Sequence, residues 1–137
     1  MAGRSTTRTA SPADAHSYLG NSLEFLRAAE HSLSHDNRVA ATGNAVTAGI
    51  LAADAIAAAR GGRVWKGEHS GAAEHLEKVG GAEGKRAATQ LRRLIPLKNR
   101  AQYDPDPIVA KDAAAALAAA SKIVSIAKAV VAGSRRS

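Results

Sequence analysis

Alanine supplies much of the apolar content of this chain, and this feature constrains the fold more than any other. Apolar residues make up 45% of the 137 residues, but aromatic residues make up only 3%. Alanine is the best helix former and a poor strand former. The sequence therefore predicts an all-helical protein whose helices pack closely with few large side chains between them, and it argues against a β-sandwich.

Apolar residues recur at helical spacing over four long segments and one short segment. Ser11 is a suitable N-cap for the first helix, because Pro12 follows it and Asp14 completes a capping-box pattern. Gly61 and Gly62 are expected to end the second helix, since helices often end in glycine. The expected helices run over about Pro12–Ser34, from Asp36 or Asn37 to Arg60, Gly71–Val79, Glu83–Gln102 and Pro107–Ala132.

Proline and aspartate mark the last two expected helices. Pro96 removes one backbone donor inside the helix over Glu83–Gln102, so a kink near it is expected. Asp106 is expected to cap the last helix, which would begin at Pro107. The long helices have similar lengths and short connections, which predicts an antiparallel four-helix bundle with an extra short helix. The segment Arg63–Glu68 is expected to be a loop.

The chain length suggests a single domain, the helical bundle over residues 11–132. Residues 1–10 are polar and lack the apolar core of a signal peptide, so a disordered N-terminal segment and a cytoplasmic protein are expected. Residues 133–137 form a short basic C-terminal tail. The longest apolar stretches contain Asp54 in one case and Lys122 with Lys128 in the other, so neither is interpreted as a membrane span.

The chain contains no cysteine, which excludes disulfides and thiolate metal sites. His31 and His35 are four residues apart, a spacing at which two histidines on a helix can bind a metal. No third ligand is evident in the sequence. We therefore interpret them as surface histidines and expect no metal and no cofactor.

Basic residues outnumber acidic ones, giving a net charge of +7 and a pI near 10.3, which favours an acidic partner such as nucleic acid. Six basic residues and no acidic residue lie between positions 85 and 100. Seven-residue spacing returns to nearly the same side of a helix, so five of them, all but Lys98, would form a broad basic face. Such a face can follow a phosphate backbone, or it can be a solvated surface. The six basic residues are Lys85, Arg86, Arg92, Arg93, Lys98 and Arg100.

Lys98 differs from the other five because it follows Ile95 by three residues, on the side of the apolar stripe. It either points into a groove between helices, where a cation needs a partner, or extends past the edge of the core. Asp54 is a candidate partner in that groove, although it can equally face solvent near Arg60. Trp65 can stack on a base or cover the edge of the core.

The run LIPLKNRAQYDP, from Leu94 to Pro105, precedes a long alanine-rich helix and resembles the end of HEPN-domain proteins. One branch of that superfamily has an arginine, a short alanine-acid-tyrosine-aspartate stretch and then the last helix. The segment Asn44–Ala59 with the glycines after it, and then His69-Ser70-Gly71, is similar to that branch's second helix and following loop. The resemblance covers about Ser11 to Ala132 and implies a bundle of four or five helices.

Many HEPN proteins are metal-independent ribonucleases, often toxins or defence components paired with a small nucleotidyltransferase. Their motif is an arginine followed four to six residues later by a histidine, both facing a groove and meeting their copies across a dimer. Here Lys98 stands in place of that arginine, unless Arg100 takes its role, and no histidine occurs after His75. Tyr103 and Asp104 occupy the nearby positions, and Gln102 replaces the common acidic residue.

The missing histidine favours binding over cleavage. Histidine suits both proton transfers of RNA cleavage, whereas tyrosine is a poor base and lysine holds a phosphate without arginine's two-pronged geometry. We expect a HEPN-like protein, of a toxin–antitoxin or defence system, that binds RNA or a nucleotide and forms a homodimer. The dimer follows from the resemblance and from the small residues of the second and fifth helices.

Two alternatives remain open at this stage. One is an active ribonuclease in which Lys98 and Tyr103 are catalytic, and the other is a protein-interaction module that docks a nucleotidyltransferase partner. The residues expected to bind nucleic acid are Lys85, Arg86, Arg92, Arg93, Lys98, Asn99 and Arg100, and those expected to line the groove are Asp54, Gln102, Tyr103 and Asp104.

Overall fold

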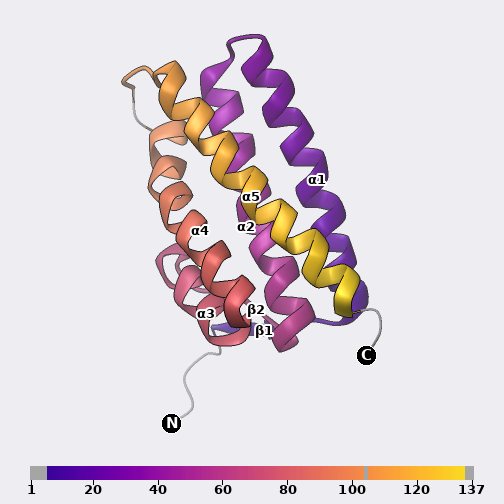
Figure 1. Ribbon diagram of the computed structural model, residues 1–137. Helices are drawn as coiled ribbons and strands as arrows, with labels where there is room; N and C mark the ends of the chain where they lie inside the picture. The colour runs from indigo at the N-terminus through magenta and orange to yellow at the C-terminus, as the bar shows by residue number, and fades with distance from the viewer. Residues whose placement is uncertain (1–5, 104, 135–137) are drawn as a thin grey trace.

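Four long helices lie side by side and alternate in direction, as the computed structural model shows for residues 6–103 and 105–134 (Figure 1). A short helix packs beside the third of them, at the end of the bundle where two small strands lie. This arrangement confirms the predicted all-helical fold with four antiparallel helices and an extra short one. The elements are β1 (Thr7–Thr9), α1 (Pro12–Ser34), α2 (Arg38–Gly61), β2 (Arg63–Trp65), the 3-10 helix η1 (His69–Gly71), α3 (Ala72–Val79), α4 (Gly81–Gln102) and α5 (Ala110–Ser134).

Local signals fix the first two helices where the sequence predicts them. The Ser11 hydroxyl accepts a hydrogen bond of 3.0 Å from the Asp14 amide, and the Asp14 carboxylate accepts one of 2.9 Å from the Ser11 amide. This reciprocal pair is the predicted capping box. Gly62 ends α2 with φ of 68°, a left-handed conformation in which glycine carries no steric penalty.

The start of α5 differs from the prediction. The helix begins at Ala110, not at Pro107, and its first carbonyl acceptor is that of Val109, which receives the amides of Asp112 and Ala113. Asp106 is therefore not its N-cap. Ile108, which precedes the helix, is only 4% exposed, and this burial is a tertiary contact that a local capping rule does not contain.

The two strands correct a second prediction. Residues 1–10 were expected to be disordered and Arg63–Glu68 to be a loop, but Thr7–Thr9 pairs antiparallel with Arg63–Trp65, with Arg8 opposite Val64. The pair is extended by hydrogen bonds on both sides, and Val64 is buried. Residues 1–5 and 135–137 of the expected terminal segments lie outside the described residues, and positions 133 and 134 belong to α5.

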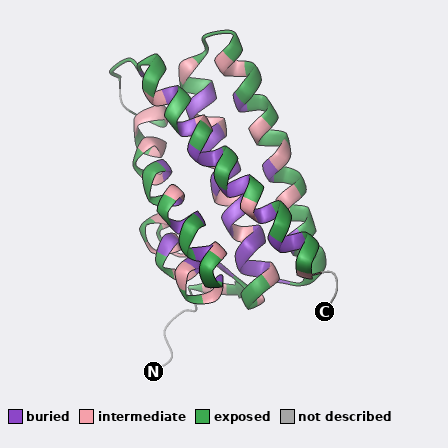
Figure 2. Cartoon of the chain, viewed as in Figure 1, coloured by how far each residue is buried: buried purple, intermediate pink, exposed green. Residues whose placement is uncertain are grey.

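The helix α2 lies at the centre of the bundle and packs against α1, α4 and α5. Twelve of its residues are buried, and most are alanine or glycine. Buried residues follow the inward sides of the long helices (Figure 2). The small residues of α2, from which a dimer surface was expected, therefore serve packing within the chain. The largest fully buried side chains are Ile56, Leu76, Leu91, Leu94 and Ile123.

Two helices, α2 and α5, are long and apolar enough to cross a membrane by length and composition alone. The core helix of a soluble protein meets the same criterion, and more than half of the apolar stretch of α2 is buried inside the bundle. The criterion therefore gives only weak support for a membrane span. Pro96 lies inside α4, which continues to Gln102, and the kink expected there stays a prediction.

Gly49 and Gly43 offer a matched test of the packing of α2. A Cβ added at Gly49 would overlap with the buried side chain of Leu94 and lie 3.4 Å from Ile123, whereas one added at Gly43 meets no described atom within 4 Å. Gly49→Ala is expected to lower the free energy of unfolding by about 1–3 kcal/mol. Gly43→Ala is expected to raise it by about 0.5–1 kcal/mol, because alanine costs less entropy in a helix. Urea unfolding of both variants measures the difference, and equal effects would contradict it.

Candidate nucleic-acid interface

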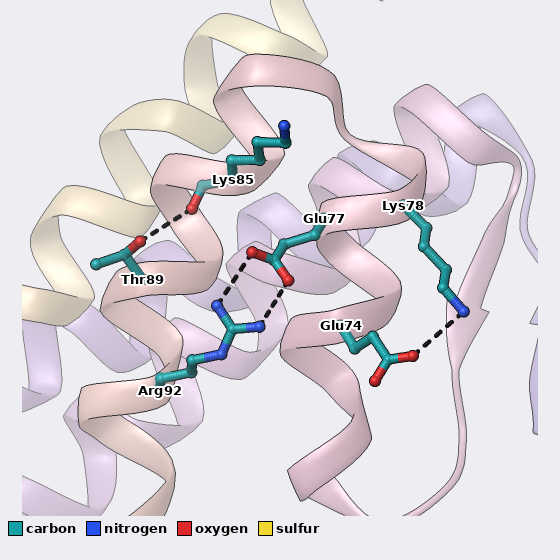
Figure 3. A network of polar contacts seen from close by, with 6 residues as sticks. All are labelled: Glu74, Glu77, Lys78, Lys85, Thr89 and Arg92. Carbon is teal, nitrogen blue, oxygen red and sulfur yellow. Dashed lines mark hydrogen bonds and ion pairs between the residues drawn. The ribbon is translucent and has the colours of Figure 1, made fainter.

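The basic face of α4 is divided between two neighbouring helices, α3 and α5. On the α3 side, the Arg92 guanidinium donates two hydrogen bonds to the Glu77 carboxylate, at 2.6 and 3.2 Å (Figure 3). This bond is the main cause that lowers the pKa of Glu77, and the nearby charge of Lys85 acts in the same direction. The positive charge on this side is therefore partly neutralised by α3.

The end of α4 is also paired with a carboxylate. The guanidinium of Arg100 donates a hydrogen bond of 3.1 Å to the side chain of Asp112, in the first turn of α5. This contact joins the two helices across the Pro-rich turn. Two of the arginines expected to bind nucleic acid, Arg92 and Arg100, thus have partners within the chain.

On the other side of α4, basic side chains face α5. Arg86, Gln90 and Arg93 follow one another at spacings of four and three residues, so they share one side of the helix. Arg86 and Gln90 line a hollow of about 300 Å³ with Lys122 of α5, and Gln90 and Arg93 line another of about 200 Å³, again with Lys122. We call these two hollows together the α4–α5 groove.

The cations of the α4–α5 groove are not held in ion pairs by the described part of the chain. Among the residues that the structure describes, Arg86, Arg93 and Lys122 form no ion pair within 4.0 Å, and Arg93 donates a hydrogen bond of 3.4 Å to the Gln90 side-chain oxygen. The charge of Arg86 helps to lower the pKa of Glu83, but the two side chains form no ion pair. Besides Lys122, the α5 wall consists of alanines at 115, 118 and 119 and of Ser125 and Ile126. The groove therefore carries positive charge on both helices, and its α5 wall presents small side chains around Lys122.

Sequence reasoning identified Arg86 and Arg93 but missed Gln90 and Lys122. The packing of α5 beside α4, which brings Lys122 to the groove, is a tertiary contact. Which basic residues of α4 form ion pairs also depends on how α3 and α5 pack against it.

Lys98 and Asn99 lie in a different place. With Ile95 they line a hollow of about 250 Å³ whose other wall is formed by Glu68, His69 and Ser70. Lys98 is half-buried there, next to Ile95, on the side of the apolar stripe where its spacing predicts it. We call this space the Lys98 hollow.

Asp54 lies in a third space, a small cavity with Trp65, His75 and Leu91. Burial raises the pKa of its carboxyl to about 7, and the charge of Arg8 acts weakly in the opposite direction. No hydrogen bond or ion pair to this carboxyl occurs among residues 6–103 and 105–134.

The groove expected to join Asp54 to the end of α4 is not formed. Leu91 lines the Asp54 cavity, and Gln102 follows it by eleven residues, which is roughly 16 Å along a helix. Gln102 and Tyr103 are exposed, Tyr103 at 75%, and Asp104 lies outside the described residues. Asp54 also lines a different hollow from Lys98, so the two are not partners across one groove.

Trp65 covers the edge of the core. Its indole nitrogen donates a hydrogen bond of 2.7 Å to the Glu68 carbonyl, and its ring lies 5.8 Å from that of His75, measured between centroids. Gly71 approaches the ring so closely that a Cβ there would overlap with it. Of the two interpretations of Trp65, this packing favours the structural one over base stacking.

The remaining histidine pair lies at the far end of α1. The rings of His31 and His35 are 4.4 Å apart between centroids, and the Nδ1 of His35 lies 3.0 Å from the His31 carbonyl oxygen. Within the described part of the chain, no group of three His, Cys, Asp or Glu residues is arranged to hold a metal ion.

Comparisons of the chain with protein-family models, with characterised proteins and with solved structures found no match. The resemblance to HEPN proteins therefore stays a prediction.

The Asp54 carboxyl makes stability depend on pH. Its pKa is higher in the folded chain than the ordinary value of 3.8. The contribution of the protonated carboxyl to the free energy of unfolding is therefore complete below about pH 4, and it is lost as the pH rises through about 7. Asp54→Asn removes this pH dependence. The free energy of unfolding of the variant minus that of the parent is therefore expected to be greater at pH 8 than at pH 4 by up to about 4 kcal/mol. Urea unfolding at both pH values measures it. Glu30→Gln, an exposed position on α1, is the control, and an equal gain there would contradict the assignment.

Proposed function

We propose that this protein binds RNA through the α4–α5 groove. The observation that carries the proposal is the gathering of Arg86, Arg93 and Lys122 on one surface without an ion pair among the described residues, while Arg92 and Arg100 are held in ion pairs. A cation without a protein partner can neutralise a phosphate and release its counterions, which is the main source of affinity for nucleic acids.

The geometry of the groove suits an extended strand. Arg86 and Arg93 are seven residues apart, roughly 10 Å along α4, so they reach different phosphates. Gln90 lies between them with both an amide donor and a carbonyl acceptor, and it can bond to a ribose hydroxyl or a base edge. The choice of RNA over DNA rests on the resemblance to HEPN proteins.

This interface includes fewer residues of α4 than the one expected from the sequence. Lys85 and Arg92 lie beside Glu77 and add to the electrostatic field, but they are not its main contacts. Lys98 and Asn99 line a separate hollow. The proposal therefore assigns RNA binding to α4 and α5 together, and not to α4 alone.

The proposal is for binding, without cleavage. The position expected to carry the catalytic histidine has none, and Tyr103 is exposed at the C-cap of α4 while Lys98 lies half-buried against η1. These two side chains do not line one hollow, which argues against a shared reaction centre. Membership of a toxin–antitoxin or defence system and a homodimer are part of the proposal on the strength of the resemblance. A cytoplasmic location is part of it because residues 1–10 lack the apolar core of a signal peptide.

Charge removal in the groove tests the proposal. Combining Arg86→Ala with Arg93→Ala is expected to weaken binding of a labelled single-stranded RNA about tenfold or more, and to reduce the slope of log K against log salt by about 1.4. Fluorescence anisotropy at several salt concentrations measures both quantities.

Arg92→Ala is the matched control, because it removes the same charge from the same helix at a position already paired with Glu77. It is expected to change RNA affinity much less than the double variant. An equal loss in both, or no RNA binding at low salt, contradicts the proposal; the second result would favour an acidic protein partner, such as a nucleotidyltransferase, on the same groove. The same RNA incubated with chelator reports any cleavage.

A further inference from the structure

The Lys98 hollow has walls from two parts of the chain that are distant in sequence. Ile95, Lys98 and Asn99 come from α4, and the wall opposite comes from η1 and the residue before it. The space of about 250 Å³ is large enough for a phosphoryl group together with part of a small molecule. It lies apart from the α4–α5 groove, since Leu97, the neighbour of Lys98, faces that groove instead.

The side chains around the hollow are mostly hydrogen-bond donors. They are the Lys98 ammonium, the Asn99 amide, the Ser70 hydroxyl and the His69 imidazole, while Glu68 contributes the one acceptor-only group. Lys98 is half-buried and has no ion pair among the described residues, Glu68 included. An ammonium in such a place gains most from an anion that accepts several hydrogen bonds.

The wall opposite α4 is held in place before any ligand arrives. The Trp65 indole bonds to the Glu68 carbonyl at 2.7 Å, and the Gly71 amide donates to the same carbonyl at 2.9 Å. The close approach of Gly71 to the indole ring fixes η1 against β2. His69 and Ser70 are therefore presented on a fixed turn, so that little ordering entropy is lost on binding.

We propose that the Lys98 hollow binds a phosphate monoester, with Lys98, His69, Ser70 and Asn99 as its hydrogen-bond donors. The ligand is inorganic phosphate or the terminal phosphate of a small nucleotide. This site is separate from the RNA interface proposed above and does not depend on it. Glu68 is expected to weaken the affinity for the dianion, because this acidic residue lines the same space.

Binding of the phosphate is tested with the full chain by NMR titration at constant ionic strength. Inorganic phosphate, adenosine monophosphate and adenosine are the probes, with chloride as the salt control. Phosphate and the monophosphate are expected to shift the resonances of His69 and Asn99 at millimolar concentration, and adenosine is not. A tighter fit for the monophosphate identifies a nucleotide site, and equal affinities identify a site for the phosphoryl group alone.

Three variants separate the outcomes. Lys98→Gln is expected to weaken phosphate binding about tenfold or more, and Glu68→Gln is expected to strengthen it, a gain that a damaged fold would not produce. Arg93→Ala, in the α4–α5 groove, is expected to leave phosphate affinity unchanged, just as Lys98→Gln leaves RNA affinity unchanged. Shifts produced equally by chloride or adenosine, or shifts that persist in Lys98→Gln, would overturn the assignment.

Discussion

The close packing of α2 against its three long neighbours is the contact on which the rest of the structure depends. Its alanines and glycines bring neighbouring backbones close together, and the missing Cβ of Gly49 leaves the space that the Leu94 side chain fills. Leu94 in turn fixes the rotation of α4 about its axis. That rotation decides which α4 side chains meet α3, which meet α5 and which point toward η1.

The functional surfaces follow from that rotation. On the α3 side Arg92 meets Glu77, whereas on the α5 side Arg93 lies beside alanines and Lys122, and only Arg100, near the start of α5, meets a carboxylate, that of Asp112. The total charge of α4 is therefore a poor guide to its binding surface, because carboxylates on adjacent helices neutralise some of its arginines. A rotation of about 100° per residue separates the α4–α5 groove from the Lys98 hollow, although Leu97 and Lys98 are neighbours.

Features that depend on nearby residues could be predicted from the sequence, and features that depend on distant ones could not. The capping box of α1, the glycine stop of α2 and the half-buried place of Lys98 follow from spacing and residue type. The pairing of β1 with β2 joins segments separated by two long helices, and no local sequence pattern predicts it. The burial of Ile108, the role of Lys122 and the separation of Asp54 from Lys98 likewise require the packed bundle.

The strand pair also sets an order of events during synthesis. The strand β1 leaves the ribosome first, but its partner β2 is made only after α1 and α2 are complete. Those two helices form a local hairpin and can pack while β1 still has nothing to pair with. Pairing then draws the beginning of the chain across the base of an already formed hairpin, with Ala10 bonded to Gly62. The strand β1, although it is made before α1 and α2, can thus take its place only after both of them.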